Sequence, residues 1–238
     1  MFFFGDGGPV STVLSFLLGA AFIAAIAWGA IRYQQAVQRW RAQTVAWVTS
    51  RGWTWTDRDD ALAERLSTRP FGAGDERQAR EIITGARDGR PFQAFRYVVV
   101  EHTRDSKGNR HTSREDFQVV WVPLGAALPP LRFAPDDVLQ RALTGLGWGD
   151  VDTESHEFNR RWRVSTRDDA YAHAVLAPHV IEELLRPAWS GATLVIEGNL
   201  AAVVRHGRPD LAHLDATLDR LEAFTSAIPP FVLADYGA

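Results

Sequence analysis

The sequence predicts an α+β domain attached to one membrane-spanning helix. Three observations support this fold class. A single long apolar run lies near the N-terminus, strand patterns in the rest of the chain follow one another in hairpins, and helical patterns lie between and after them. We therefore expect an N-terminal transmembrane helix that continues into a juxtamembrane helix, followed by a mainly antiparallel sheet with helices.

The apolar run extends from Val13 to Ile31 without a charged residue, and residues 10–12 lengthen it. At about 1.5 Å per residue, a helix of this length crosses a hydrocarbon core of roughly 30 Å. A cleaved signal peptide is the competing interpretation, but it requires a basic n-region, and Asp6 is the only charged residue before the run. The sequence therefore predicts a short tail at 1–9 and a retained signal-anchor helix at 10–31 in the lipid bilayer.

Residues 32–51 contain neither Pro nor Gly and continue the helical pattern as a juxtamembrane helix. Tyr33, Val37, Trp40, Thr44 and Trp47 form an apolar seam at heptad spacing. The seam either packs against the soluble domain or forms a homodimer through this helix. Roughly two heptads are present, whereas a coiled coil needs about three to four, so packing is favoured.

Basic residues on one side of the apolar run predict its orientation. Arg32, Arg39, Arg41 and Arg51 follow it, and no Lys or Arg precedes it. Because basic residues close to a span stay on the cytoplasmic side, we expect a single-pass protein of the cell membrane. Its N-terminus is expected outside and its C-terminal domain in the cytoplasm.

Gly52 ends the helical pattern, and residues 52–238 read as one soluble α+β domain. Residues 192–197 and 200–205, joined by Gly198-Asn199, give the clearest β-hairpin pattern. The polar segment 103–115 is typical of a long hairpin tip. Other strand patterns lie at 53–56, 80–84, 92–102, 116–122, 131–134 and 161–166.

Paired carboxylates precede three helical patterns. Such pairs serve as acid and base in hydrolases, but an Asp directly before a helix accepts hydrogen bonds from its free N–H groups. We therefore interpret all three sets as helix caps. The sets are Asp57, Asp59 and Asp60; Asp136 and Asp137; and Asp168 and Asp169.

Gly145, Gly147 and Gly149 superficially suggest a phosphate-binding loop. A dinucleotide fingerprint has the spacing G-x-G-x-x-G and follows a strand, whereas these glycines have the spacing G-x-G-x-G and follow a helical pattern. The end of a helix and a turn are expected there.

Several classes of chemistry have no sequence support. The chain has no Cys, and a net charge of -3 gives no reason to expect nucleic acid as a partner. No zinc-protease, nucleophile-elbow or phosphate-loop motif occurs, and the seven His residues are scattered. We therefore assign no catalytic, cofactor-binding or metal-binding residue and expect no cofactor.

Residues 154–185 resemble a bacterial, actinobacterial-type family of single-pass membrane-anchored proteins of unknown function. The family pattern is F-N-x-x-[FW]-x-V, then Asp, a spaced Ala, and L-x-P-x-x-[IM]-E. A weaker match covers residues 69–122. The resemblance implies a membrane-tethered α+β domain and brings no catalytic residues. The matching positions are Phe158, Asn159, Trp162, Val164, Asp168, Ala172, Leu176, Pro178, Ile181 and Glu182.

The same segment allows a packing prediction. Alternation along one strand places Phe158, Trp162 and Val164 on a single face. Pro178 is expected to begin a helix, and Trp162 is expected to be buried against that helix at 181–185.

The function predicted from these observations is a membrane-tethered, non-catalytic interaction domain with a protein partner at the membrane. A pleckstrin-homology-like module is compatible by fold analogy alone. The alternative is a hydrolase whose site is assembled from Asp and His residues that are distant in sequence.

The orientation is tested by adding protease outside intact cells. Residues 52–238 should remain uncut, because the arginines that follow the span hold the domain in the cytoplasm. Degradation of the domain in intact cells would reverse the predicted orientation.

Overall fold

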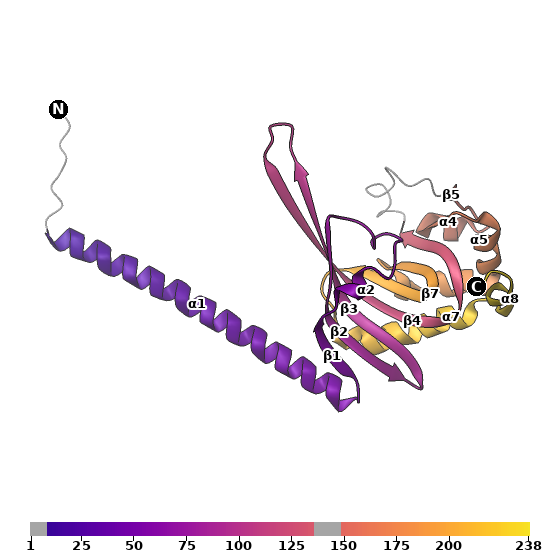
Figure 1. Ribbon diagram of the computed structural model, residues 1–238, viewed down its shortest axis with the longest axis horizontal. Helices are drawn as coiled ribbons and strands as arrows, with labels where there is room; N and C mark the ends of the chain where they lie inside the picture. The colour runs from indigo at the N-terminus through magenta and orange to yellow at the C-terminus, as the bar shows by residue number, and fades with distance from the viewer. Residues whose placement is uncertain (1–8, 136–148) are drawn as a thin grey trace. The chain divides into compact units, whose positions relative to one another are not determined.

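The computed structural model describes residues 9–135 and 149–238, with side chains at 17–135 and 151–238. The chain divides into two compact units, Met1–Arg51 and Gly52–Ala238. In the described part, the first unit is one helix, and the second holds the sheet and the remaining helices (Figure 1).

Helix α1 (Pro9–Ser50) runs without a break through the apolar run and the juxtamembrane segment, as predicted. Its 42 residues extend roughly 60 Å at about 1.5 Å per residue. Gly52 ends the helix because its left-handed backbone, with φ 73°, turns the chain away, and the Arg51 N–H donates to the Val48 carbonyl oxygen.

The second unit is built on an antiparallel sheet, which confirms the α+β class. Among the described residues the strand order is β1-β2-β3-β4-β6-β5, and β7 pairs with β4. The strands are β1 (Thr54–Arg58), β2 (Glu76–Arg87), β3 (Arg90–Arg104), β4 (Arg110–Pro135), β5 (Gly149–Asp150), β6 (Trp162–Thr166) and β7 (Thr193–His206).

Strand β4 is the centre of this sheet. Its first half pairs with β3, from Arg110 opposite Arg104 to Trp121 opposite Gln93. Its second half pairs with β6, where Phe133 lies opposite Val164. The predicted short strand at 131–134 is therefore the end of a 26-residue strand.

The predicted hairpin at Gly198-Asn199 is wrong. Both halves belong to the single strand β7, which pairs with β4 on either side of an irregularity. Leu200 lies opposite Pro123, and Ile196 lies opposite Leu131. Gly198 has φ 58° and allows β7 to bend where β4 bends, so the turn-forming residue serves a kink within one strand.

One face of the sheet is covered by helix α2 (Asp60–Ala63) and the loop that follows it. The carboxylate of Glu197 on β7 holds this loop, since it accepts bonds from the Ser67 N–H and hydroxyl and from the Thr68 N–H at 2.6–3.1 Å. The core beneath comprises Leu62, Ala63, Leu66, Phe71, Ala79, Ile82, Phe95, Tyr97, Val99, Phe117, Val119, Trp121, Val195, Leu200, Ala202 and Val204.

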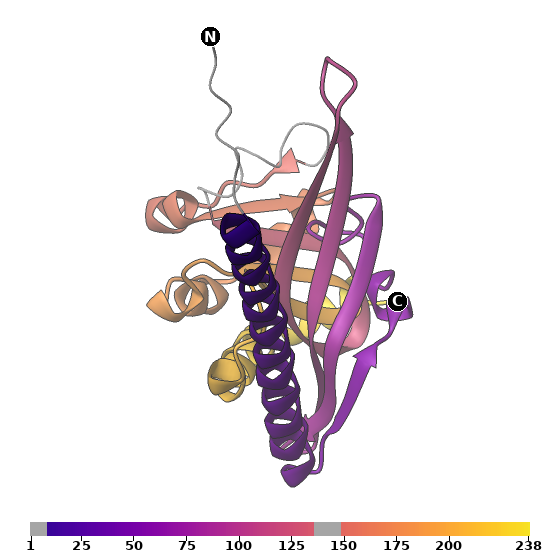
Figure 2. The ribbon, with the colours of Figure 1, turned by 90° about the vertical axis from the view of Figure 1, so that its left-hand side faces the viewer.

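C-terminal helices lie beside the opposite face of the sheet (Figure 2). The longest, α7 (Leu214–Ala227), buries Leu218, Leu221 and Phe224. The Phe224 ring lies 5.9 Å from the Phe133 ring on β4. The others are α4 (His156–Arg161), α5 (Asp169–Val175), α6 (Pro178–Leu184) and α8 (Pro230–Asp235), with 3-10 turns at Pro187–Trp189 and Leu211–His213.

The segment before β6 differs from the prediction at one residue. Phe158 lies in α4 rather than on the strand, because the Ser155 hydroxyl caps that helix and accepts a bond from the Phe158 N–H at 3.3 Å. Trp162 and Val164 do share a face of β6, and both are buried. Pro178 begins α6, as predicted.

Trp162→Ala should leave little folded protein. The indole is only 5 % exposed, and its Nε1 donates to the Leu184 carbonyl oxygen at 2.9 Å, which joins β6 to the end of α6. Truncation of a buried Trp typically costs about 3–5 kcal/mol, a large share of the roughly 5–15 kcal/mol that stabilises a domain. Thermal unfolding of the full-length protein measures the loss.

Arg161→Ala is the matched control one residue away. Its side chain is 49 % exposed, pairs with Glu157 and donates to the Leu185 carbonyl oxygen at 2.7 Å. Its removal should cost below about 1 kcal/mol, because exposed ion pairs contribute little. Equal tolerance of both substitutions would contradict the packing described for Trp162.

Candidate functional site

Helix α1 is the one described helix that is long and apolar enough to cross a membrane, by length and composition. A single helix cannot bury its own side chains, so Leu18, Phe22 and Ile26 stand exposed along it. At the C-terminal end of the apolar run, the Arg32 guanidinium lies 5.3 Å from the centre of the Trp28 ring. Trp and Arg are typical of the boundary between lipid and water.

In each of the two described sets of carboxylates, one Asp caps a helix, as predicted. Asp59 caps α2 and accepts a bond from the Ala61 N–H, and Asp168 caps α5 and accepts one from the Tyr171 N–H, each at 3.0 Å. Asp57 instead bonds the Trp55 indole, and Asp60 pairs with Arg58. The pair Asp136–Asp137 and the glycines at 145 and 147 lie outside the described residues.

The hydrolase alternative needs Asp and His side chains that converge. Within the described ranges, no group of three or more His, Asp or Glu residues is arranged to hold a metal ion. All seven His residues are described and exposed. Three of them lie within 4.0 Å of a carboxylate: His111 and His213 contact nearby residues of the chain, and His102 contacts Glu76 on the neighbouring strand.

The predicted hairpin at 103–115 exists, but sequence reasoning missed that its sides are paired strands: the ends of β3 and β4 form a two-stranded arm at residues 101–115. The strands continue pairing as far as Arg104 opposite Arg110, so the predicted tip at 103–115 is shortened to 105–109. Figure 1 shows this arm projecting beyond the rest of the sheet. Every residue of the arm is exposed except Asp105, which is half-buried.

The tip of the arm is an ordered turn. The Asp105 carboxylate accepts bonds from the N–H groups of Lys107 and Asn109 and from the Asn109 amide at 2.8–2.9 Å. These bonds, with the Asn109 amide as the largest cause, lower the pKa of Asp105. Gly108 supplies the left-handed backbone that the turn requires, with φ 84°.

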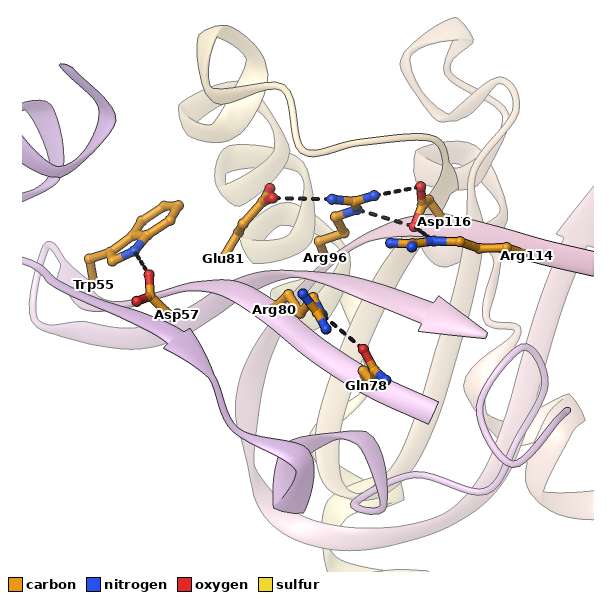
Figure 3. A network of polar contacts seen from close by, with 8 residues as sticks. All are labelled: Trp55, Asp57, Gln78, Arg80, Glu81, Arg96, Arg114 and Asp116. Carbon is orange, nitrogen blue, oxygen red and sulfur yellow. Dashed lines mark hydrogen bonds and ion pairs between the residues drawn. The ribbon is translucent and has the colours of Figure 1, made fainter. Parts of the chain in front are cut away.

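A buried arginine joins the base of the arm to β2 (Figure 3). Arg96 on β3 is 7 % exposed at its side chain. Its Nε and Nη2 donate to the two oxygens of Asp116 at 3.1 and 2.7 Å, and its Nη1 donates to Glu81 at 3.1 Å. Arg114, on the arm itself, approaches Asp116 at 3.6 Å. The fork geometry fixes where the arm leaves the sheet.

The ion pair with Arg96 also constrains the backbone conformation of Glu81. Glu81 has φ 55°, an uncommon value for a residue with a side chain, at the point where the β2–β3 register shifts. Such strain costs about 1–3 kcal/mol and persists only where neighbouring contacts hold it. The Arg96–Glu81 bond is such a contact, so the bulge and the ion pair depend on each other.

The electrostatics of the network follow from its burial. For Asp116, burial alone would raise the pKa, but Arg96 and then Arg114 outweigh it and hold the pKa below its ordinary value. The Arg96 pKa is raised, because its two carboxylates outweigh its own burial. Arg96 and Asp116 are therefore both charged at neutral pH.

Part of this network was visible as a sequence signal. Arg96 interrupts the apolar strand pattern FRYVVV, and Asp116 is the first residue of the pattern DFQVVWV in the next strand. One charge in each of two paired apolar strands indicates a buried ion pair. The third member, Glu81, gives no such signal, because its position depends on a bulge.

No protein-family model and no curated protein matches the chain. The fold does match a solved structure, the crystal structure of the mycobacterial trehalose monomycolate transport factor A, TtfA. The TM-score is 0.53 and the sequence identity 12 %, and the match covers 79 % of this chain and 94 % of that chain. At this identity the likeness concerns the fold alone. An actinobacterial protein therefore shares this α+β architecture, which agrees with the family resemblance at that level.

Arg96→Met should lower the free energy of unfolding by about 2–3 kcal/mol, since it removes three charged hydrogen bonds and leaves the strained Glu81 without its cation. Arg80→Met is the control, because Arg80 lies opposite Arg96 and its Nε donates to Gln78. Its cost should stay below about 1 kcal/mol. Chemical unfolding of the full-length variants measures both.

The difference between parent and Arg96→Met should also depend on pH. The folded pKa of Asp116 is lowered, so this stabilisation is present above the unfolded pKa of about 3.9 and is lost as pH falls through the folded pKa. A difference that stayed constant from pH 7 to pH 2.5 would contradict the role assigned to Asp116.

Proposed function

We propose that this chain is a membrane-tethered, non-catalytic interaction protein. Helix α1 anchors it in the cell membrane by one pass, with the N-terminus outside and residues 52–238 in the cytoplasm. The domain binds a protein partner at the membrane through the arm at 101–115. The anchor is supported by the length and composition of α1, and the orientation by the arginines that follow the apolar run.

The observation that carries the proposal is the arm. An isolated two-stranded hairpin is marginally stable in water, yet this one is exposed on both faces. Its base is clamped by Arg96 and its tip by Asp105, so order is maintained at both ends without a core of its own. A clamped projection that contributes no core suits contact with another molecule.

The charge on the arm suits a polar protein surface. Four cations and three acidic residues lie along it, a mixture that favours specific pairing over general attraction to nucleic acid or anionic lipid. The cations are Arg104, Lys107, Arg110 and Arg114, and the acids are Glu101, Asp105 and Glu115.

The fold likeness suggests the kind of system that the partner belongs to. The similar structure is named as a transport factor, and a domain of that architecture on a membrane anchor fits an accessory protein of a membrane transport system. A homodimer through the seam at Tyr33, Val37, Trp40, Thr44 and Trp47 is a second mode of association.

The arm is tested by shortening it. Replacing residues 103–111 with Asn-Gly joins the paired residues His102 and Thr112 through a two-residue turn and keeps the Arg96 network. The shortened protein should enter the membrane and unfold like the parent, because the lost residues bury no core. It should lose its partner in capture from native membranes.

Site-specific crosslinking supplies the control. A photoreactive residue at Thr103 should crosslink the partner, whereas one at the exposed Glu182 on α6 should not. A shortened protein that captured the same partners as the parent would exclude the arm. Crosslinks at position 182 alone would place the contact on the helical face.

A further inference from the structure

A pocket of about 620 Å³ lies on the sheet face that α2 and its following loop cover. This volume lies within the range of about 300–1,000 Å³ that is typical of small-molecule sites. The loop forms one wall, and strands β3, β4 and β7 form the others. Residues that define it include Arg69, Gly74, Val99, Phe117, Arg132 and Val204.

Arg132 is the unusual member of this lining. It lies in the second half of β4, opposite Ser165 on one side and Val195 on the other, and is only 8 % exposed. Its Nε donates to the Arg69 carbonyl oxygen at 3.1 Å. Its two terminal nitrogens donate to no protein group among the described residues, and neither is fully enclosed, so they face the pocket.

The charge of Arg132 is not compensated within the described part of the chain. No described carboxylate lies within 4.0 Å of its guanidinium. Burial, and then the nearby Arg69 cation, lower the pKa of Arg132. A buried cation without a counter-ion is costly, so natural proteins normally pair it.

Several other arginines in this domain are paired with carboxylates. Arg96 is held by two carboxylates. A smaller pocket of about 340 Å³ near α7 contains Arg87 and Arg90, and these pair with Asp219 and Glu222. Arg132 differs because its open donors face a cavity rather than an acid.

Close packing at Gly74 and hydrogen bonds from Glu197 fix the loop that forms one wall of the pocket. Gly74 has φ 75°, and a Cβ there would lie 2.4 Å from Cγ1 of Val99, so the loop approaches the sheet as closely as a glycine allows. Glu197 holds the same loop at Ser67 and Thr68. A preformed cavity binds its ligand with little ordering cost.

The remaining walls restrict the kind of ligand. Val99, Phe117 and Val204 are buried and apolar, and the His206 ring lies 4.6 Å from the Phe117 ring. Glu101 and Glu115 are exposed members of the lining and disfavour ligands with several negative charges. The lining therefore combines three arginines, of which Arg132 is the most deeply buried, with an apolar wall and acidic residues exposed to solvent.

We propose that this pocket binds a small, partly apolar ligand that carries one anionic oxygen group, a carboxylate or a phosphate, held by the two terminal nitrogens of Arg132. The guanidinium fork matches such a group with two parallel hydrogen bonds. The apolar part of the ligand lies against Phe117, Val99 and Val204. This inference does not rest on the partner-binding role of the arm.

Calorimetric titration of the full-length protein in phosphatidylcholine nanodiscs tests the site. The probes are phenyl phosphate, phenylacetate, benzyl alcohol and inorganic phosphate. An anionic aromatic probe should bind at least about tenfold more tightly than benzyl alcohol, which lacks the charge, and than inorganic phosphate, which lacks the apolar part. The better of phenyl phosphate and phenylacetate identifies the anionic group.

Two variants and one control locate the binding. Arg132→Met keeps an unbranched apolar side chain but removes the guanidinium, and it should lower the affinity for the anionic probe by about tenfold or more. Ser113→Phe fills the pocket from an exposed position and should do the same without touching Arg132. Arg104→Met, on the arm, should leave the affinity unchanged.

Each outcome decides the proposal. If Arg132→Met unfolds, Ser113→Phe tests the pocket by itself, because that substitution leaves the buried arginine in place. No binding of either anionic probe to the parent protein, or equal binding by the parent and Ser113→Phe, overturns the proposal. Loss of binding in Arg104→Met as well would mean that surface charge, not the pocket, attracts the probe.

Discussion

The pairing of β4 with three other strands is the constraint on which the described domain depends. Its first half joins β3, its second half joins β6, and β7 follows it on the other edge through a shared bend. Strand β4 contributes buried residues to both faces of the sheet. The core under α2 and its loop and the core under the C-terminal helices therefore depend on the same strand. The bend near Pro123 and Gly198 turns a single sheet into a surface that both layers can cover.

Strand β4 also contributes a charged residue to both the ion network and the pocket. Asp116 near its beginning fixes Arg96, and Arg132 near its end lies at the pocket. The two arginines are about equally buried but have opposite surroundings, since Arg96 faces two acids and Arg132 faces open space. Burial alone lowers the pKa of an arginine, and the difference in partners explains why one pKa rises and the other falls.

The sequence predicted the elements whose signals are local. The membrane helix, the caps at Asp59 and Asp168, the start of α6 at Pro178 and the burial of Trp162 each depend on residues within a few positions of one another. The errors arose where pairing between distant segments determines the local structure. Gly198-Asn199 has the composition of a turn, but both flanking segments find the same partner in β4, and tertiary pairing overrides the local preference. Phe158 fits the strand alternation, yet the Ser155 cap begins a helix there.

The pocket and the contribution of Glu81 to the ion network were beyond sequence reasoning for the same reason. Arg69 and Arg132 are 63 residues apart and meet only because the loop after α2 folds back onto the sheet. The bulge that presents Glu81 to Arg96 has no signature in composition. Patterns report periodicity within an element, whereas a pocket and a buried ion network are formed between elements.

A membrane anchor lowers the affinity that an arm of mixed charge needs in order to bind a partner. Exposed ion pairs contribute roughly 0–1 kcal/mol each, so a contact made by such an arm alone is weak in solution. A partner in the same membrane is confined near the anchor, and confinement raises the effective concentration toward the millimolar range. A weak, specific contact is then sufficient, and a cooperative arm that is clamped at its base by Arg96 loses little entropy when it binds. In the proposed function, the long helix therefore supplies proximity to the partner and the exposed arm supplies selectivity.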